Sequence, residues 1–247
     1  MPDVPPKTSS SDARWSGLFK LGGGASIAIA VLLLAEFAVY AMIPDPGSLA
    51  EKNLELFIQS PLAGLLSFDL LGMAAYILFI PAILALYIAL HRYSEAAMLV
   101  ATALFFVGIA DFFATNTGFP MLSLSNQYAL ASTPEEQQAI LASSQAMIAV
   151  FEENAFLVSY VIVSFSWFVI SLVMFRSRVF GRITATMGIL AGTAGVVAVV
   201  LEHITFINAV TTAIAIYFLA IVFLMLWVFL SGTRLLRLGD LVSKESA

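Results

Sequence analysis

The chain has 247 residues, of which 61% are hydrophobic and only 11% are charged, and its formal net charge is -5. A soluble domain carries about 25% charged residues, so this composition excludes an ordinary soluble protein and predicts an integral membrane protein. Cysteine is absent, which excludes disulfides, thiolate metal sites, catalytic thiols and S-acylation. Nothing in the charge balance points to nucleic-acid binding.

Six apolar stretches are long enough to cross a hydrocarbon core, which requires about 20 helical residues. They cover residues 21–43, 62–90, 96–114, 151–175, 183–201 and 209–230. The fifth is the least hydrophobic because it is rich in glycine. The sequence therefore predicts an all-α integral membrane protein, a bundle of six transmembrane helices in one domain over residues 21–232.

The two ends of the chain are polar. Residues 1–20 contain several prolines and a run of three serines, so we expect a disordered tail, and residues 233–247 are expected to form a C-terminal tail. A cleavable secretory signal is the alternative for the first stretch. That stretch exceeds the usual 7 to 15 apolar residues and contains Glu36, which favours an uncleaved first span.

Basic residues predict the orientation of the bundle, since they favour the cytoplasmic side. Ten of the eleven fall on one side of the predicted spans, and only Lys52 falls on the other. The ten are Lys7, Arg14, Lys20, Arg92, Arg176, Arg178, Arg182, Arg234, Arg237 and Lys244. We therefore expect both termini in the cytoplasm. Eleven of the 16 acids lie in the spans or on the outer side, where they would attract cations and repel anions.

Two outer loops carry helix-start patterns and predict short surface helices. Ser48 to Glu51 fits a capping box, and Ser60-Pro61 fits a cap followed by a first-turn proline. Thr133-Pro134-Glu135-Glu136 is a third start of this kind. A continuous helix from Pro134 to the end of the fourth span would be about 63 Å long, roughly twice the core thickness, so it must bend or project from the membrane.

Three carboxylates, Glu36, Asp69 and Asp111, lie inside predicted spans without a Lys or Arg in the same half of those spans. A charged acid in hydrocarbon is costly, so each must be protonated, hydrogen-bonded or neutralised by a cation. Counting helical residues from the span ends places all three in the outer half of the membrane. Glu202 and His203 fall at the outer interface.

These five residues are the candidate site for a cation or a proton. Carboxylate oxygens suit a hard divalent cation such as calcium, magnesium or manganese, while a lone histidine argues against a zinc hydrolase. Proton translocation would also use acids of this kind. The structural alternative is a set of protonated acids that hold helices together by hydrogen bonds, with Glu202 and His203 forming an ordinary interfacial pair.

Two short motifs carry a family resemblance. Leu90-His-Arg-Tyr-Ser-Glu95, and Phe175-Arg-Ser-Arg178 followed by Arg182 and the Gly188 to Gly192 segment, look like the turns of a bacterial six-span membrane protein family. That family is catalogued as a domain of unknown function, number 4386. The resemblance implies a helical bundle in the bacterial plasma membrane and no established activity. Members often place an Arg and a Glu in span three, where this chain has Phe105 and Gly108 and carries its acid at Asp111.

The leading functional hypothesis is a non-enzymatic, multi-pass plasma-membrane protein with a cation- or proton-responsive site, acting in transport or sensing. The alternatives are an accessory or assembly protein, whose polar residues only join helices, and a lipid-directed hydrolase or transferase. No nucleophile motif, phosphate-binding loop or cofactor motif is present. The glycines at 188 and 192 predict close helix packing within the chain, with homo-oligomerisation or a membrane-protein partner as the alternative.

Overall fold

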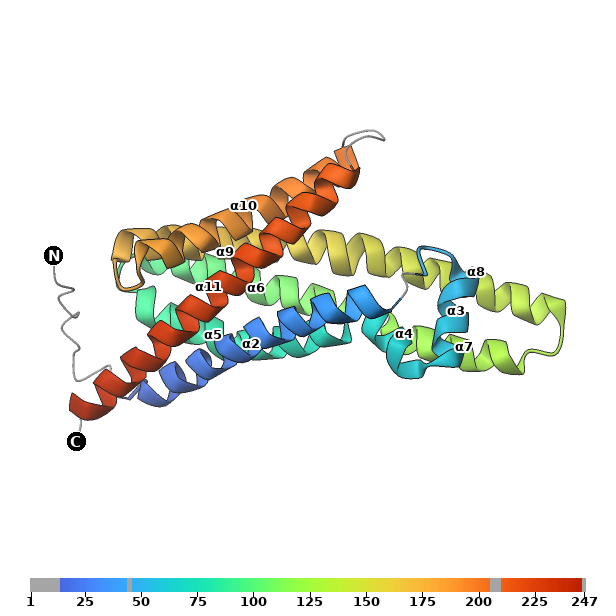
Figure 1. Cartoon of the computed structure of the whole chain (residues 1–247), viewed down its shortest axis with the longest axis horizontal. Coiled ribbons are helices and arrows are strands. Elements are labelled where there is room, and N and C mark those ends of the chain that lie inside the picture. Colours follow the sequence, from blue (N-terminus) through green and yellow to red (C-terminus); the bar gives the residue numbers. More distant parts are fainter. Residues whose placement is uncertain (1–13, 44–45, 205–209, 246–247) are drawn as a thin grey trace. The chain divides into compact units, whose positions relative to one another are not determined.

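The structure is a computed structural model that describes residues 14–43, 46–204 and 210–245 (Figure 1). The described residues form helices and connecting turns, without a β-strand. In chain order the helices are α2 Ser16–Met42, α3 Ala50–Gln59, α4 Pro61–Ser67, α5 Leu70–Leu90, α6 Glu95–Thr115, α7 Gly118–Leu130, α8 Pro134–Val150, the π-helix η1 Phe151–Val158, α9 Ser159–Ser177, α10 Arg182–Ile204 and α11 Val210–Glu245.

Among the described residues, six helical runs are long and apolar enough to cross a membrane, which confirms the predicted number of spans. The runs are Ser16–Met42, Leu70–Leu90, Glu95–Leu130, Pro134–Ser177, Arg182–Leu201 and Ala215–Lys244. The fourth contains the predicted long helix, and its π-helical turn lies between α8 and α9. A π-turn inserts an extra residue per turn into a helix and often marks a functional position.

Helical structure extends into both predicted tails. Helix α2 already begins at Ser16, and α11 continues to Glu245, so residues 16–20 and 233–245 are helical. The two helix ends support each other: Ser16 Oγ donates to the Gly239 carbonyl at 3.0 Å, and Lys20 Nζ lies 3.3 Å from Asp240 Oδ1. The first 13 residues lie outside the described part of the chain.

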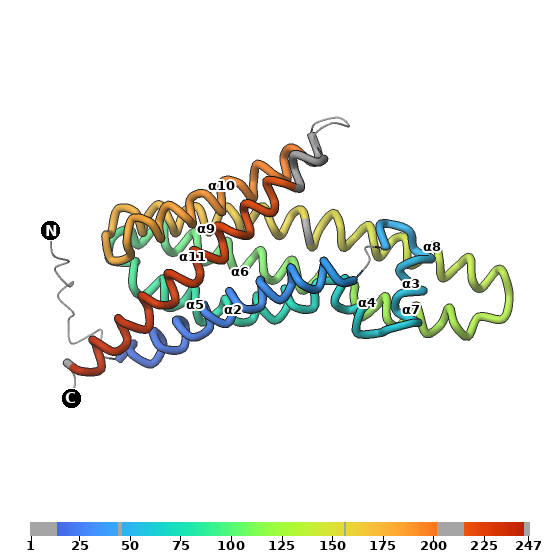
Figure 2. Tube along the Cα trace, viewed as in Figure 1, coloured from blue at the N-terminus to red at the C-terminus, as the bar shows by residue number. Residues whose placement is uncertain are grey.

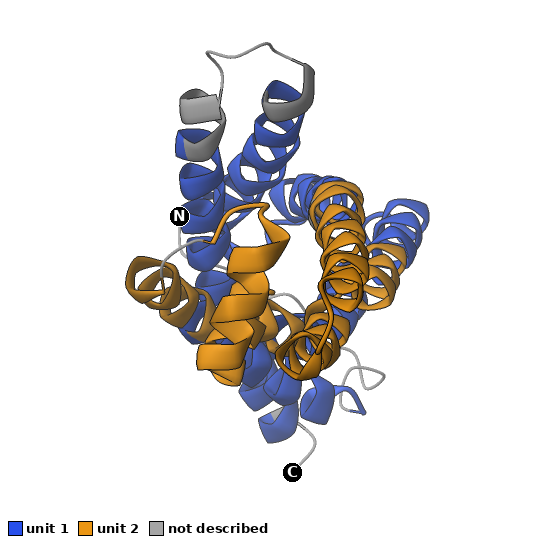
Figure 3. Cartoon of the chain, turned by 90° about the vertical axis from the view of Figure 1, so that its right-hand side faces the viewer, with its two compact units in different colours: residues 1–31, 75–106, 161–247 blue, residues 32–74, 107–160 orange. Residues whose placement is uncertain are grey.

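The chain divides into two compact units (Figure 3). Unit 1 comprises residues 1–31, 75–106 and 161–247, and unit 2 comprises residues 32–74 and 107–160. Within unit 1, α10 and α11 pack along each other as a helical hairpin, visible as neighbouring tubes in Figure 2.

Close helix packing in unit 1 depends on glycine. A Cβ on Gly192 would lie 2.6 Å from the Ser164 carbonyl oxygen, and one on Gly188 would overlap the Ser171 hydroxyl and the Trp227 ring. Because a Cβ at either position meets another part of the same unit, these glycines pack α10 against α9 and α11. The predicted packing within one chain is confirmed.

Unit 2 gathers its short helices around a separate apolar cluster. Leu54, Phe57, Phe68, Met121 and Ile148 are all buried there. The Phe68 ring centroid lies 5.6 Å from that of Phe57 and 4.9 Å from that of Phe151. Phe68 therefore packs α3 and η1 against the end of α4.

Two of the three predicted helix caps of unit 2 are confirmed. Ser60 Oγ accepts from Ala63 N at 3.2 Å with Pro61 in the first turn, and Thr133 and Glu136 form a reciprocal capping box. The box predicted at Ser48 is wrong: Leu49 is the N-cap of α3 and makes no side-chain cap. A tight turn replaces it, because Gly47 has φ +61° and Asn53 Nδ2 donates to the carbonyls of Gly47 and Leu49.

Candidate functional site

The centre of the candidate site is Asp69, which lies at an interruption between α4 and α5. Its backbone has φ +62°, a left-handed conformation that residues other than glycine rarely adopt. Asp tolerates this conformation better than most residues. The Asp69 carboxylate then accepts from Gly72 N at 3.0 Å and caps α5. The side chain is 8% exposed, so a carboxyl group is buried where one helix ends and the next begins.

Gly72 provides the space that the carboxyl group occupies. A Cβ at this position would overlap both carboxyl oxygens and the Cγ atom of Asp69. Glycine in a helix costs about 0.5–1 kcal/mol relative to alanine, so its presence here favours the carboxyl position over helix stability.

Asn116 supports the interruption from the end of α6. Its Nδ2 donates to the Phe68 carbonyl at 2.8 Å, which the break in the helix leaves available, and its Oδ1 accepts from Gly118 N at 3.1 Å. Next to it, Thr117 Oγ1 donates to the Met147 carbonyl at 2.9 Å. The α4–α5 and α6–α7 breaks are therefore joined by side-chain hydrogen bonds, and a third contact extends to α8.

Glu36 of α2 brings a second carboxyl group to Asp69. The two side chains are hydrogen-bonded, and Glu36 is also hydrogen-bonded to Tyr40, one helical turn further along α2. An ionised carboxylate has no proton to donate, so two carboxyl groups can hydrogen-bond only when at least one is protonated. A contact of this kind therefore requires a shared proton, or a cation that neutralises the pair, between a buried Asp69 and a partly buried Glu36.

The other predicted site residues are placed differently. Asp111 is partly buried in α6, and its Oδ2 atom is shielded from solvent without a hydrogen-bond partner in the described structure. Glu202 and His203 belong to the last turn of α10, and their side chains lie outside the described part of the protein. Within the residues that the structure covers, no three His, Cys, Asp or Glu side chains gather to hold a metal. The structure thus brings together two of the five, and the five-residue cation site stays a prediction.

Sequence reasoning missed three contributors. Tyr40 follows Glu36 by four residues, a spacing that places both side chains on one helix face. Gly72 follows Asp69 by three residues, the spacing of an aspartate N-cap and the amide that it binds. Asn116 carried no such local signal, because the carbonyl it binds lies 48 residues away in the chain.

Comparison with known proteins gives a family without an activity. No curated protein and no solved structure matches the chain. A family described as "Domain of unknown function (DUF4386)" matches residues 14–232. The matched range includes all six membrane-crossing stretches predicted from the sequence. The chain belongs to this DUF4386 family.

Proposed function

We propose that this protein is a multi-pass membrane protein whose Glu36–Asp69 pair binds a proton or a hard cation, and that it acts in transport or sensing. The observation that carries the proposal is the hydrogen-bonded contact between two carboxyl groups at a helix interruption. A helix break beside a polar side chain inside a membrane protein is typical of ion and proton sites, because it combines side-chain and backbone groups at one point.

The hydrogen bonds around the Glu36–Asp69 pair favour a site that changes when it gains or loses a proton or a cation, over a purely structural role. Two acids cannot both ionise at this distance without repelling each other, so the pair changes its hydrogen bonding when the proton leaves or a cation enters. Asp69 also caps α5, and Asn116 joins the same break to α7. A change at the carboxyl pair would therefore reach helix ends that belong to different segments of unit 2.

The predicted topology gives the pair access to cations. On the orientation expected from the basic residues, Glu36 and Asp69 lie in the outer half of the membrane, beneath loops that are predominantly acidic. Such a surface raises the local concentration of cations, including protons. We place the protein in the plasma membrane with both termini in the cytoplasm as part of this proposal.

The test is the thermal unfolding of the purified protein as a function of pH and of added Na⁺, Mg²⁺ and Ca²⁺. A cation that binds the folded state stabilises it by about 2.7 kcal/mol at 100 times its dissociation constant, so a site produces a concentration-dependent rise in the melting temperature. We expect the pH response or the cation response of the wild-type protein to disappear in E36Q/D69N. Asn at position 69 can still accept from Gly72, so the cap of α5 is kept.

D111N is the matched control, because it removes a membrane-embedded acid that is not hydrogen-bonded to the pair. It should retain the response to pH or cations. A response of E36Q/D69N equal to that of the wild-type protein contradicts the proposal and favours the accessory role, in which the acids only join helices. A Mg²⁺ or Ca²⁺ response identifies a divalent-cation site, whereas a response to pH alone identifies a proton site.

A further inference from the structure

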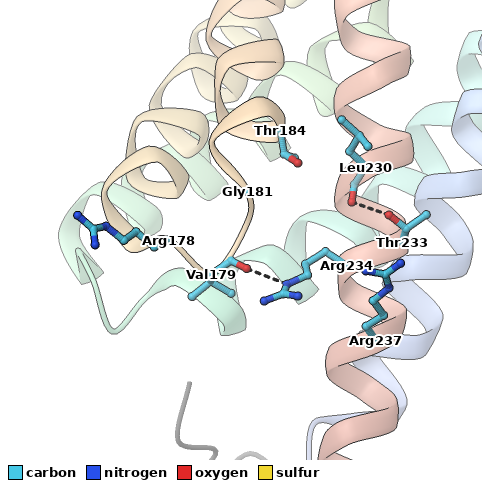
Figure 4. Close-up of a pocket in the computed structure, with 8 residues that line it drawn as sticks. All are labelled: Arg178, Val179, Gly181, Thr184, Leu230, Thr233, Arg234 and Arg237. Atoms are coloured by element: carbon cyan, nitrogen blue, oxygen red, sulfur yellow. Dashed lines mark hydrogen bonds between the residues drawn. The ribbon is translucent and has the colours of Figure 1, made fainter. Parts of the chain in front are cut away.

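A second polar site lies in unit 1, in a pocket of about 240 Å³ between the α9–α10 turn and α11 (Figure 4). From the turn and the start of α10 it is lined by Arg178, Gly181 and Thr184, and from α11 by Leu230, Arg234 and Arg237. It belongs to a different unit from the Glu36–Asp69 pair, and the inference below does not depend on the function proposed for that pair.

Two guanidinium groups give this pocket its charge. Arg234 and Arg237 are three residues apart on α11, so they project from the same face of the helix. Arg234 Nε donates to the Val179 carbonyl at 2.9 Å, which fixes the group at the pocket. Its terminal nitrogens make no hydrogen bond to the described residues. In Figure 4 the Arg178 side chain points away from these two, so Arg178 is not counted as a ligand.

Among the described residues that line the pocket, none is acidic and could balance these charges. The nearest acid along α11 is Asp240, which forms an ion pair with Lys20 at 3.3 Å. Two neighbouring cations without a carboxylate repel each other, and a bound anion would relieve this repulsion.

The start of α10 adds uncharged donors at the same place. The first N–H groups of a helix have no partner within the helix, and the helix dipole makes this end favourable for an anion. Thr184, in the first turn of α10, is buried and lines the pocket. Guanidinium groups beside a helix N-terminus and a hydroxyl are the donor set that binds phosphate.

We propose that this pocket binds a phosphate group, held by Arg234 and Arg237 at the N-terminus of α10. The anionic headgroup of a phospholipid is the favoured source, because Leu230 lines the pocket and the apolar run of α11 ends just before Arg234. Beside the pocket residues, Ile183 is 70% exposed and Phe229 is 47% exposed, which provides apolar surface for an acyl chain. Basic pockets between membrane helices bind lipid headgroups in this manner.

The experiment uses the full-length protein, purified in a neutral detergent and stripped of lipid. Thermal unfolding is followed while phosphatidylglycerol, phosphatidylcholine or inorganic phosphate is added separately. We expect phosphatidylglycerol to raise the melting temperature and phosphatidylcholine to have a much smaller effect, since its headgroup carries its own cation. R237Q should weaken the apparent affinity for phosphatidylglycerol at least about tenfold, the loss expected for a hydrogen bond to a charged group.

R176Q is the control, because it removes the same charge as R237Q at a residue outside the pocket. Arg176 is exposed in the last turn of α9 and does not line the pocket. R237K retains the charge and should recover part of the affinity. R234Q also loses the bond to Val179, so its unfolding without lipid is measured separately from its lipid response.

Three results distinguish the outcomes. A phosphatidylglycerol response that R237Q weakens and R176Q leaves intact supports a lipid headgroup. An Arg237-dependent response to inorganic phosphate alone supports the same phosphate site with a soluble ligand. If R237Q responds to every addition as the wild-type protein does, or if R176Q loses as much affinity as R237Q, the proposed site is overturned.

Discussion

At the scale of single residues, the candidate site is built on one unusual backbone conformation. Asp69 adopts φ +62° and thereby directs its carboxyl group both to Gly72 N and to Glu36. A left-handed residue other than glycine costs free energy, and Asp and Asn bear this cost best among side-chain-bearing residues. The capping bond and the carboxyl contact offset that cost.

The space beside Asp69 gives a prediction for Gly72. In G72A the new Cβ would overlap the Asp69 carboxyl group, so we expect the free energy of unfolding to fall by about 1–3 kcal/mol, as for other overpacked sites. Chemical denaturation measures the change. The control is G24A, because Gly24 is an exposed helical glycine with open space around its Cβ position. G24A should leave stability unchanged or raise it by up to about 1 kcal/mol, and an equal loss in both variants would contradict the account of Gly72.

At the scale of helices, the structure differs from a simple bundle in having interrupted spans. α4 and α5 break at Asp69, α6 and α7 break around Asn116, and α8 joins α9 through a π-helix. Asn116 joins the first two breaks through the carbonyl of Phe68 and the amide of Gly118. The first two interruptions are thus stabilised by one shared side chain.

Replacing this side chain should loosen both breaks together. In N116A the Phe68 carbonyl and the Gly118 amide lose their partners, which is expected to cost about 1–3 kcal/mol. Hydrogen exchange should become faster at the amides of residues 68–73 and 117–121 and stay unchanged in the α10–α11 hairpin of unit 1. Faster exchange throughout the chain would instead indicate general destabilisation, and unchanged exchange at both breaks would exclude the connecting role of Asn116.

Local sequence patterns predicted some of these helix ends and not others. Ser60 and Thr133 cap their helices as expected, because a cap depends on residues within one turn. Ser48 does not, since the Gly47 turn and the Asn53 side chain provide another way to start α3. The bond from Asn116 to Phe68 depends on two segments far apart in the chain, which no local pattern can reveal.

At the scale of the whole molecule, hydropathy was sufficient to predict six membrane-crossing helices and a helical fold, and the described residues show both. It was not sufficient to predict which acids would meet. α2 and α5 are apolar on all sides, so their periodicity does not indicate which face turns inward. The sequence places Glu36, Asp69 and Asp111 in the same outer half of the membrane, yet among the described residues the contact forms between Glu36 and Asp69 and does not include Asp111. The orientation of the termini stays a prediction from the basic residues.

The central claim is that the Glu36–Asp69 pair holds a proton that pH or a cation can displace. Infrared spectroscopy tests it most directly, because the C=O stretch of a protonated carboxylic acid is separate from the bands of a carboxylate. The account predicts a protonated-acid band in cation-free buffer that E36Q and D69N each abolish or shift and that D111N preserves. It also predicts that raising the pH, or adding a cation that stabilises the protein, diminishes this band. A protonated-acid spectrum that is the same in the wild-type protein, E36Q and D69N would contradict the claim.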